Sequence, residues 1–216
     1  MMKRLVIVAL VAIASAGCAG SDGPTASGIL GPTSPDASPS SRVSSAPTRA
    51  PTRAPATVEP ATTDGAVGTT FVDPEGAYRI TVPDEWVANH GAFAEGVELW
   101  FTGPAEDGFR PNLNVLTQVV GEMDLDAYGE LSIEGAPTLI AEFELVDSRT
   151  EIGQGGTELG VMEYRGRVAA GGPLGFLSVY AISDEKAIVA TLTTSADTYA
   201  AQRDAWLPYL LTLEPT

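Results

Sequence analysis

The chain has 216 residues, of which 28 are acidic and 12 are lysine or arginine, so its formal net charge at pH 7 is −16. A surface this acidic repels phosphate backbones and anionic headgroups, which excludes nucleic acid as a partner. One cysteine and one histidine are too few for a disulfide framework or for the usual ligand set of zinc.

The N-terminus predicts a signal peptide over residues 1–17. Lys3 and Arg4 precede an uninterrupted apolar run at 5–14, and small residues follow at 15–17. A charged start, a short apolar run and a small-residue cleavage site are typical of secretory signals. The run is too short to cross a hydrocarbon core, which requires roughly 20 apolar residues.

Cys18, the single cysteine, follows directly. Ala16, Gly17 and Cys18 resemble the lipobox of bacterial lipoproteins, in which diacylglycerol alkylates the thiol, although Ser15 stands where that motif usually has leucine. The resemblance implies lipidation of Cys18 and a lipid-anchored location on the extracytoplasmic face of the cell membrane. The alternative is ordinary cleavage that leaves a free thiol, which would invite intermolecular pairing in an oxidising compartment.

Residues 18–67 predict a disordered stalk that begins at the lipidated cysteine. The segment is mostly Ser, Thr, Pro, Ala and Gly, it contains eight of the sixteen prolines, and APTR occurs twice in succession at 46–53. Such a composition buries too little apolar surface to offset chain entropy. We interpret it as a spacer between anchor and domain, either bare or glycosylated.

A single folded domain is expected over residues 68–216, a length that supports one core. Four acids and five bases lie before position 66, which leaves the domain 24 acids, 7 bases and a formal charge of −17. Alternation and turn residues predict strands at 71–72, 78–82, 97–102, 113–120, 142–148, 160–168, 174–182 and 187–194.

Two further segments, 125–140 and 198–211, show helical spacing of their apolar residues. Ser195 or Asp197 can cap the second helix, and Pro208 should kink or end it.

The apolar pattern of the strands predicts the architecture. Residues 176–182 are largely apolar on both alternating faces, which is typical of a strand covered on both sides. Residues 160–167 alternate instead, with Glu163, Arg165 and Arg167 on one face, which predicts that the strand lies toward an edge or a wet face. We expect an α+β fold in which an antiparallel β-sheet has helices packed on both faces.

The order of elements carries a resemblance to a known fold. An aromatic-x-Ile-x-Val-Pro strand at 78–83 precedes Trp86, and PNLNV at 111–115, a helix, three late strands and a closing helix follow. This order resembles the PsbP-like fold, and within it the LpqN-type lipoproteins of mycobacteria and other actinobacteria. Over residues 71–214, the resemblance implies an α/β/α sandwich that binds a protein or a small ligand at the cell envelope. It implies no catalytic set.

The sequence offers few candidate catalytic residues. His90, which we place in a surface loop, is the only histidine that could act as a base, and no serine lies in a Gly-x-Ser-x-Gly elbow. Glu142 and Glu144 share a strand face and are expected to be solvated. We predict no enzymatic activity, no catalytic or metal-binding residue and no cofactor; the alternative is a carboxylate-dependent hydrolase that acts on an envelope substrate.

Residues 124–135 partly match a calcium-binding EF-hand loop. Positions one, three and six fit, but Tyr128 occupies position five and Gly135 stands where the bidentate glutamate belongs. We expect instead that Asp124 caps the helix that begins at Leu125.

These features favour a non-catalytic binding module held away from the membrane. The expected partner is an envelope protein, a small hydrophobic ligand such as a lipid, or a wall component. It would dock at the sheet edge or at an aromatic cleft near Trp86 and Trp100.

Overall fold

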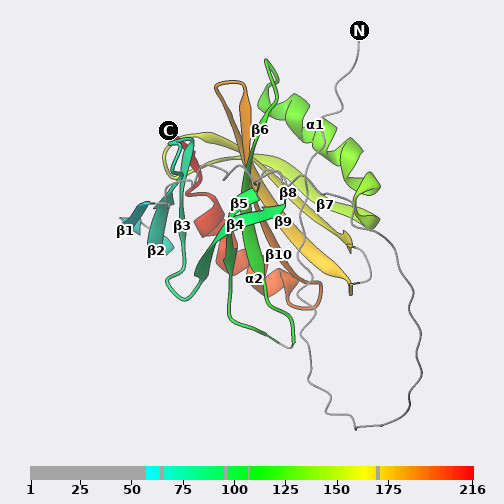
Figure 1. Ribbon diagram of the computed structural model, residues 1–216. Helices are drawn as coiled ribbons and strands as arrows, with labels where there is room; N and C mark the ends of the chain where they lie inside the picture. Colours follow the sequence, from blue (N-terminus) through cyan, green and yellow to red (C-terminus); the bar gives the residue numbers. More distant parts are fainter. Residues whose placement is uncertain (1–56, 64–65, 95–96, 107, 169–170) are drawn as a thin grey trace, which may run out of the picture.

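The structure is a computed structural model that describes residues 57–63, 66–94, 97–106, 108–168 and 171–216 (Figure 1). These residues form two antiparallel sheets, two α-helices and a short 3-10 helix. The predicted signal peptide, Cys18 and residues 19–56 of the predicted stalk lie outside the described residues.

The larger sheet has the strand order β4-β5-β6-β10-β9-β8-β7, and every neighbouring pair is antiparallel. Its strands are β4 (Val87–Ala94), β5 (Val97–Thr102), β6 (Asn112–Val119), β7 (Ala141–Ile152), β8 (Glu158–Arg167), β9 (Leu174–Ser183) and β10 (Lys186–Ser195). The antiparallel sheet is confirmed. β4 was not predicted, and it contains His90, which pairs with Leu99 in a strand and does not lie in a loop.

The smaller sheet was not predicted as a separate sheet. Its order is β1 (Thr57–Thr63), β2 (Ala66–Val72), β3 (Tyr78–Val82) and β11 (Glu214–Pro215). The expected hairpin of β2 and β3 is present, and Asp73 organises its turn by accepting hydrogen bonds from the backbone N–H groups of Glu75 and Ala77. β1 lies inside the range that the composition predicts as stalk.

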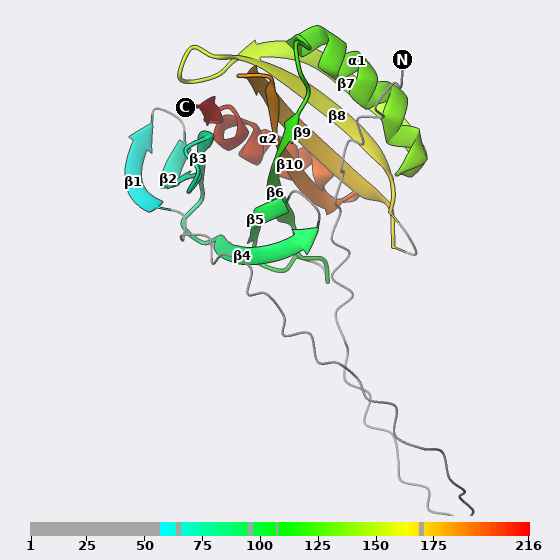
Figure 2. The same ribbon diagram turned by 45° about the horizontal axis from the view of Figure 1, so that its top comes forward.

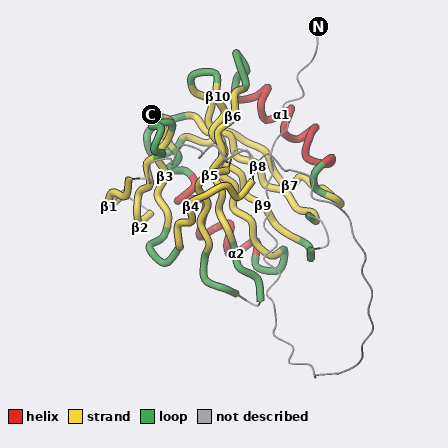
Figure 3. The backbone as a smooth tube through the Cα atoms, viewed as in Figure 1, coloured by secondary structure: helices red, strands yellow, loops and turns green. Residues whose placement is uncertain are grey.

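Helix α1 (Leu125–Gly135) is followed by the 3-10 helix η1 (Ala136–Thr138), so the regular helix ends earlier than the predicted residue 140 (Figure 3). Pro137 lacks the N–H that a continuing α-helix requires. The predicted cap is confirmed, because Asp124 Oδ1 accepts a hydrogen bond from the Ala127 N–H at 2.8 Å.

Helix α2 (Tyr199–Leu210) starts one residue later than predicted. Thr198 occupies the N-cap position and makes no side-chain cap hydrogen bond, so neither Ser195 nor Asp197 is the cap that the sequence predicts. Ser195 Oγ accepts a hydrogen bond from the Thr198 N–H at 3.3 Å. Pro208 lies in the last turn, and the helix ends two residues beyond it.

The two faces of the larger sheet belong to different core clusters, and β9 contributes alternate residues to each. Leu177 and Val179 pack in the cluster that contains Trp206 of α2, whereas Phe176 and Tyr180 pack in the cluster that contains Tyr128 of α1. Figure 2 shows α1 lying over β7 and β8.

Strands also cover the side of the sheet that holds α2. Phe71 of β2 and Ile80 of β3 join the same cluster as Trp206. The expected arrangement, with helices as the layers on both faces, is therefore not confirmed, because the smaller sheet supplies a large part of the layer that holds α2.

Candidate functional site

Glu163 of β8 is buried, so the predicted wet face is wrong at this residue, whereas Arg165 of the same face is exposed and Arg167 is half-buried. The predicted position toward an edge is observed, since β8 adjoins the edge strand β7. β8 lies between β7 and β9, and Glu163 is only 3% exposed. The physical reason is that α2 covers this face with its own polar side chains. Tyr199 and Arg203 of α2 both reach the Glu163 carboxylate.

Each carboxylate oxygen of Glu163 accepts two hydrogen bonds, and three of these four bonds come from arginine side chains. Arg203 donates from Nη2 to Oε1 at 2.9 Å and from Nε to Oε2 at 3.0 Å, the bidentate geometry that suits guanidinium and carboxylate. Arg149 of β7 donates to Oε1 at 2.7 Å, and the Tyr199 hydroxyl donates to Oε2 at 3.0 Å.

The electrostatics of this cluster favour an ionised carboxylate. Burial alone would raise the pKa of Glu163, but the hydrogen bonds from Arg203, Arg149 and Tyr199 outweigh burial and bring the pKa below its ordinary value of 4.5. A general acid for hydrolysis needs the opposite shift. Glu163 therefore attaches α2 to the sheet and is not suited to protonate a substrate.

A pocket of about 320 Å³ lies beside Trp86, and we call it the Trp86 pocket. It is formed by the segment after β3, the loop between β5 and β6, and helix α2. Its lining residues are Pro83, Glu85, Trp86, Pro104, Glu106, Pro111, Gln202, Ala205, Trp206 and Tyr209.

Aromatic rings and one polar contact organise the Trp86 pocket. The ring centroids of Trp86 and Trp206 are 4.1 Å apart, and those of Trp206 and Tyr209 are 5.5 Å apart. Gln202 Nε2 of α2 donates to Glu106 Oε2 at 2.7 Å, which ties the helix to the β5–β6 loop.

The lining chemistry suits binding. Its described residues comprise aromatic rings, three prolines and two exposed glutamates, Glu85 and Glu106, and among them there is no serine, threonine, cysteine, histidine, lysine or arginine. A nucleophile paired with a base is therefore missing from this lining. A carboxylate-dependent reaction would have to use Glu85 and Glu106.

The structure separates the two tryptophans that the sequence placed at one cleft. Trp86 belongs to the core cluster on the α2 side, whereas Trp100 packs against the cluster on the α1 side. A shared aromatic cleft is therefore wrong. The Trp86 half of the prediction coincides with a pocket, and its other ring comes from Trp206.

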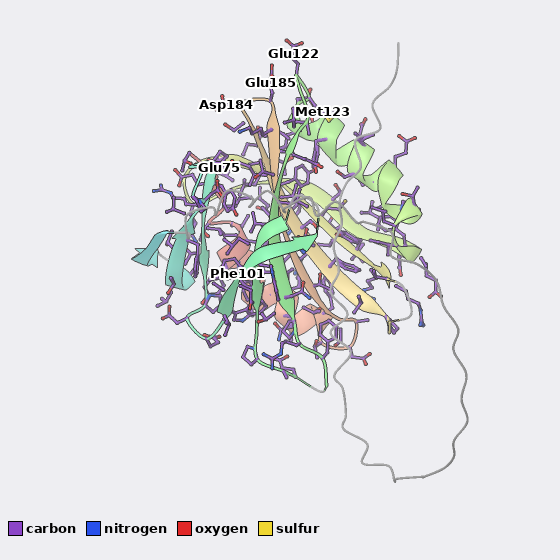
Figure 4. The ribbon with its side chains drawn as sticks, viewed as in Figure 1. Glu75, Phe101, Glu122, Met123, Asp184 and Glu185 are labelled. Atoms are coloured by element: carbon purple, nitrogen blue, oxygen red, sulfur yellow. The ribbon has the colours of Figure 1, made fainter. Side chains whose placement is uncertain are left out.

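The candidate acids of the sequence remain at the surface. Glu142 and Glu144 are exposed, as expected, and Glu142 forms an ion pair with Arg167 at 2.9 Å. In the described part of the chain, no group of three or more His, Cys, Asp or Glu side chains could hold a metal ion. Glu122, Asp184 and Glu185 project from one end of the molecule (Figure 4).

A row of buried hydroxyl groups crosses the α1 side of the sheet. The Tyr164 hydroxyl lies 3.1 Å from Ser178 Oγ, which lies 2.9 Å from Thr191 Oγ1. Thr193 is fully buried, and its Oγ1 makes no hydrogen bond to a described residue. The sequence analysis missed this row. The available signal was the presence of Ser and Thr at alternate positions of otherwise apolar strands.

No membrane-spanning helix is found among the described residues, since none of their helices is both long and apolar enough.

No family model and no curated protein match the chain. Among solved structures, the cyanobacterial PsbP protein CyanoP from Synechocystis is similar with a TM-score of 0.52 and 17% identity, covering 68% of this chain and 91% of CyanoP. LpqN of Mycobacterium tuberculosis, described as involved in cell envelope biogenesis, gives a TM-score of 0.48 and 16% identity, covering 64% of this chain and 83% of LpqN. The likeness to CyanoP supports a PsbP-like fold.

Proposed function

We propose that this chain is a lipoprotein anchored through Cys18 to the outer face of the cell membrane, and that its domain is a non-catalytic binding module. The lining of the Trp86 pocket carries the proposal for the domain. Pro104, Ala205 and Tyr209 provide apolar contact area over the buried rings of Trp86 and Trp206, and Gln202 and Glu106 provide directed polar groups.

The size of the pocket limits what can bind. Small-molecule sites usually span about 300–1,000 Å³, and the Trp86 pocket of about 320 Å³ lies at the lower end of this range. It therefore accommodates a few side chains of a partner protein or a small apolar group. The acidic domain favours a neutral or cationic partner surface.

The N-terminal features support a tethered mode of action. Lipidation at Cys18 and a spacer over residues 19–56 would hold the domain near other envelope components. Tethering converts encounter into a local search, so a weak intrinsic affinity suffices at the membrane.

In-cell photo-cross-linking tests the proposal. A photoreactive residue replaces Ala205, an exposed residue that lines the pocket, and a matched control replaces Glu134, an exposed residue on α1. We expect Ala205 to label one or a few envelope proteins or an envelope lipid and Glu134 to label none of them. Hydrolysis of an ester, peptide or glycoside by the purified chain, lost in Glu85→Gln or Glu106→Gln, would overturn the proposal in favour of a hydrolase.

A further inference from the structure

The accessible part of the Trp86 pocket is negatively charged. The rings of Trp86 and Trp206 are only 7% and 3% exposed, so a ligand contacts mainly the other lining residues. Glu85, from the segment after β3, and Glu106, from the loop between β5 and β6, are both exposed. Among the described lining residues there is no lysine or arginine. The pocket therefore presents two carboxylates to whatever enters it.

Glu106 is held in place with one oxygen available. Gln202 Nε2 donates to Glu106 Oε2 at 2.7 Å, which fixes the carboxylate against α2. Glu85 and the Oε1 atom of Glu106 have no hydrogen-bond or ion-pair partner among the described residues. Water is then what an incoming cation has to displace from these oxygens.

The arginines near the pocket are bound elsewhere. Arg203, the residue after Gln202, donates two hydrogen bonds to Glu163 of the larger sheet. Arg110 donates to the carbonyl of Gly103 at 3.4 Å, and it forms no ion pair with a carboxylate of the described residues. Because the described arginines do not neutralise the two pocket carboxylates, the pocket is complementary to a cation from another molecule.

The remaining lining residues suit a guanidinium group and its apolar stem. A guanidinium is planar, pairs with carboxylates through several N–H groups and stacks on aromatic rings. Tyr209 supplies a half-buried ring, and its hydroxyl is fixed because it donates to the Val67 carbonyl at 3.1 Å. Pro104 and Ala205 are exposed and offer apolar contact to the methylene groups of an arginine side chain.

We propose that the Trp86 pocket binds an arginine side chain on the surface of a partner protein. The guanidinium pairs with Glu106 and contacts Tyr209, and Glu85 contributes negative charge from a second segment. This inference rests on the proposed binding function of the pocket and names the chemistry of its partner.

The surroundings of the pocket favour an arginine carried by a protein over a free cation. Val67, whose carbonyl binds Tyr209, is 67% exposed and extends the apolar surface beyond the pocket. Residues that flank an arginine in a protein gain contact with this surface, whereas a free cation does not. The acidic domain also attracts a basic protein surface and speeds the encounter.

Peptide titration of the full chain tests the inference. The chain carries Cys18→Ala, which removes the predicted lipid, and binding is followed by NMR at the Gln202 side-chain amide and the Ala205 backbone amide. Three capped tripeptides have leucine at both ends and arginine, citrulline or lysine in the centre. Citrulline keeps the shape of arginine without its charge, and lysine keeps the charge without the planar group.

We expect the arginine peptide to bind about fivefold more tightly than the citrulline peptide and about twofold more tightly than the lysine peptide. Glu106→Gln should weaken the arginine peptide about threefold, and Glu85→Gln about twofold, because each removes one exposed charge. The amide introduced by Glu106→Gln retains an oxygen that can accept from Gln202, so the wall of the pocket is kept. The matched control Glu134→Gln, on the exposed side of α1, should change the affinity by less than about 1.5-fold.

Three results would overturn the inference. Equal affinity for the arginine and citrulline peptides, or no binding of either, would show that the pocket carboxylates are only solvated. Equal weakening by Glu134→Gln and Glu106→Gln would show that the overall charge of the domain attracts the peptide. A capped arginine without flanking residues that binds as tightly as the tripeptide would indicate a site for a small free cation.

The cross-linking readout separates this inference from the proposed function. If the arginine and citrulline peptides bind equally but Ala205 still labels an envelope component in cells, arginine recognition is wrong and the binding module stands. If arginine binding depends on Glu106 while Ala205 labels no envelope component, arginine recognition stands and the envelope-binding role is wrong.

Discussion

Glu163 offers the sharpest test of how α2 is attached to the sheet. The change Glu163→Gln keeps the size of the side chain but removes the negative charge that Arg149 and Arg203 share. It also replaces one acceptor oxygen with a donor amide that faces arginine donors. The substitution therefore leaves two guanidinium groups without their common anion.

The expected loss in the free energy of unfolding can be estimated from the exposed fractions of the Glu163, Arg149 and Arg203 side chains. Breaking a fully buried ion pair costs about 3–5 kcal/mol. The Glu163 side chain is 4% exposed, but those of Arg149 and Arg203 are 26% and 34% exposed, so water compensates part of their loss. We expect Glu163→Gln to lower the free energy of unfolding by about 2–3 kcal/mol, or roughly 5–10 °C in Tm for a domain of this size.

Urea unfolding followed by tryptophan fluorescence measures the effect in the full chain. The matched control is Glu142→Gln, which removes the same charge from an ion pair with Arg167 whose side chains are 41% and 71% exposed. Exposed pairs contribute about 0–1 kcal/mol, so the control should be close to wild type. A loss in Glu163→Gln below about 1 kcal/mol, or no greater than the control, would refute this reasoning.

The pH dependence of the free energy of unfolding, compared between wild type and Glu163→Gln, gives an independent check. Because the folded pKa of Glu163 lies below its ordinary value of 4.5, the unfolded chain takes up this proton first as the pH falls. The stabilisation is complete above the unfolded pKa and is lost as the pH falls through the folded pKa. The difference between wild type and Glu163→Gln should therefore be constant near neutral pH and shrink below 4.5.

Three further substitutions test close packing, capping and anchoring. A Cβ at Gly160 would lie 2.1 Å from Tyr180 Cζ, so Gly160→Ala should destabilise by about 1–3 kcal/mol; an unchanged Tm would contradict this packing. Asp124→Ala should cost about 1 kcal/mol through loss of the cap to Ala127, whereas millimolar calcium should leave the wild-type Tm unchanged; a calcium-induced rise would restore the ion-site interpretation. Cys18→Ala should move the protein from the detergent phase to the aqueous phase in a detergent partition, and continued partitioning with detergent would reject the anchor.

The parts of the fold that were predictable are those whose signal is local. The run at 176–182 predicted a strand covered on both sides, and its residues from Phe176 to Ala181 are buried. The Asp124 cap and the hairpin turn at Asp73 were also readable, because each depends on a side chain that bonds to backbone within a few residues.

The parts that were not predictable depend on partners distant in sequence. The alternation of apolar and charged residues around Glu163 is the same whether the charged face of the strand is exposed to solvent or is covered by polar side chains of a helix. Its partners Arg149 and Arg203 are 14 and 40 residues away. Nothing in the sequence alone indicates that these charges meet, so the simpler interpretation, solvent exposure, failed.

The Trp86 pocket was predicted only in part, for the same reason. Its walls come from the segment after β3, the β5–β6 loop and α2, and only the first of these carries a sequence motif. The smaller sheet escaped prediction because β1, with the sequence TVEPATT, is rich in threonine and resembles the preceding spacer in composition. Both the pocket and the smaller sheet depend on contacts between segments that are far apart in the sequence.

Helix α2 links the Glu163 cluster to the Trp86 pocket, and this link gives a final prediction. Arg203 binds Glu163 on one side of the helix, while its neighbour Gln202 binds Glu106 and Trp206 lines the pocket. Weakening the attachment at Glu163 should therefore loosen one wall of the pocket without touching its lining.

In the in-cell cross-linking experiment, Glu163→Gln should reduce the labelling of envelope components by the photoreactive residue that replaces Ala205, whereas Glu142→Gln should preserve it. The comparison is made well below the Tm of each variant, so that both are folded. Unchanged labelling in Glu163→Gln would show that Gln202 and the aromatic contacts hold α2 against the pocket on their own, with Glu163 contributing stability alone.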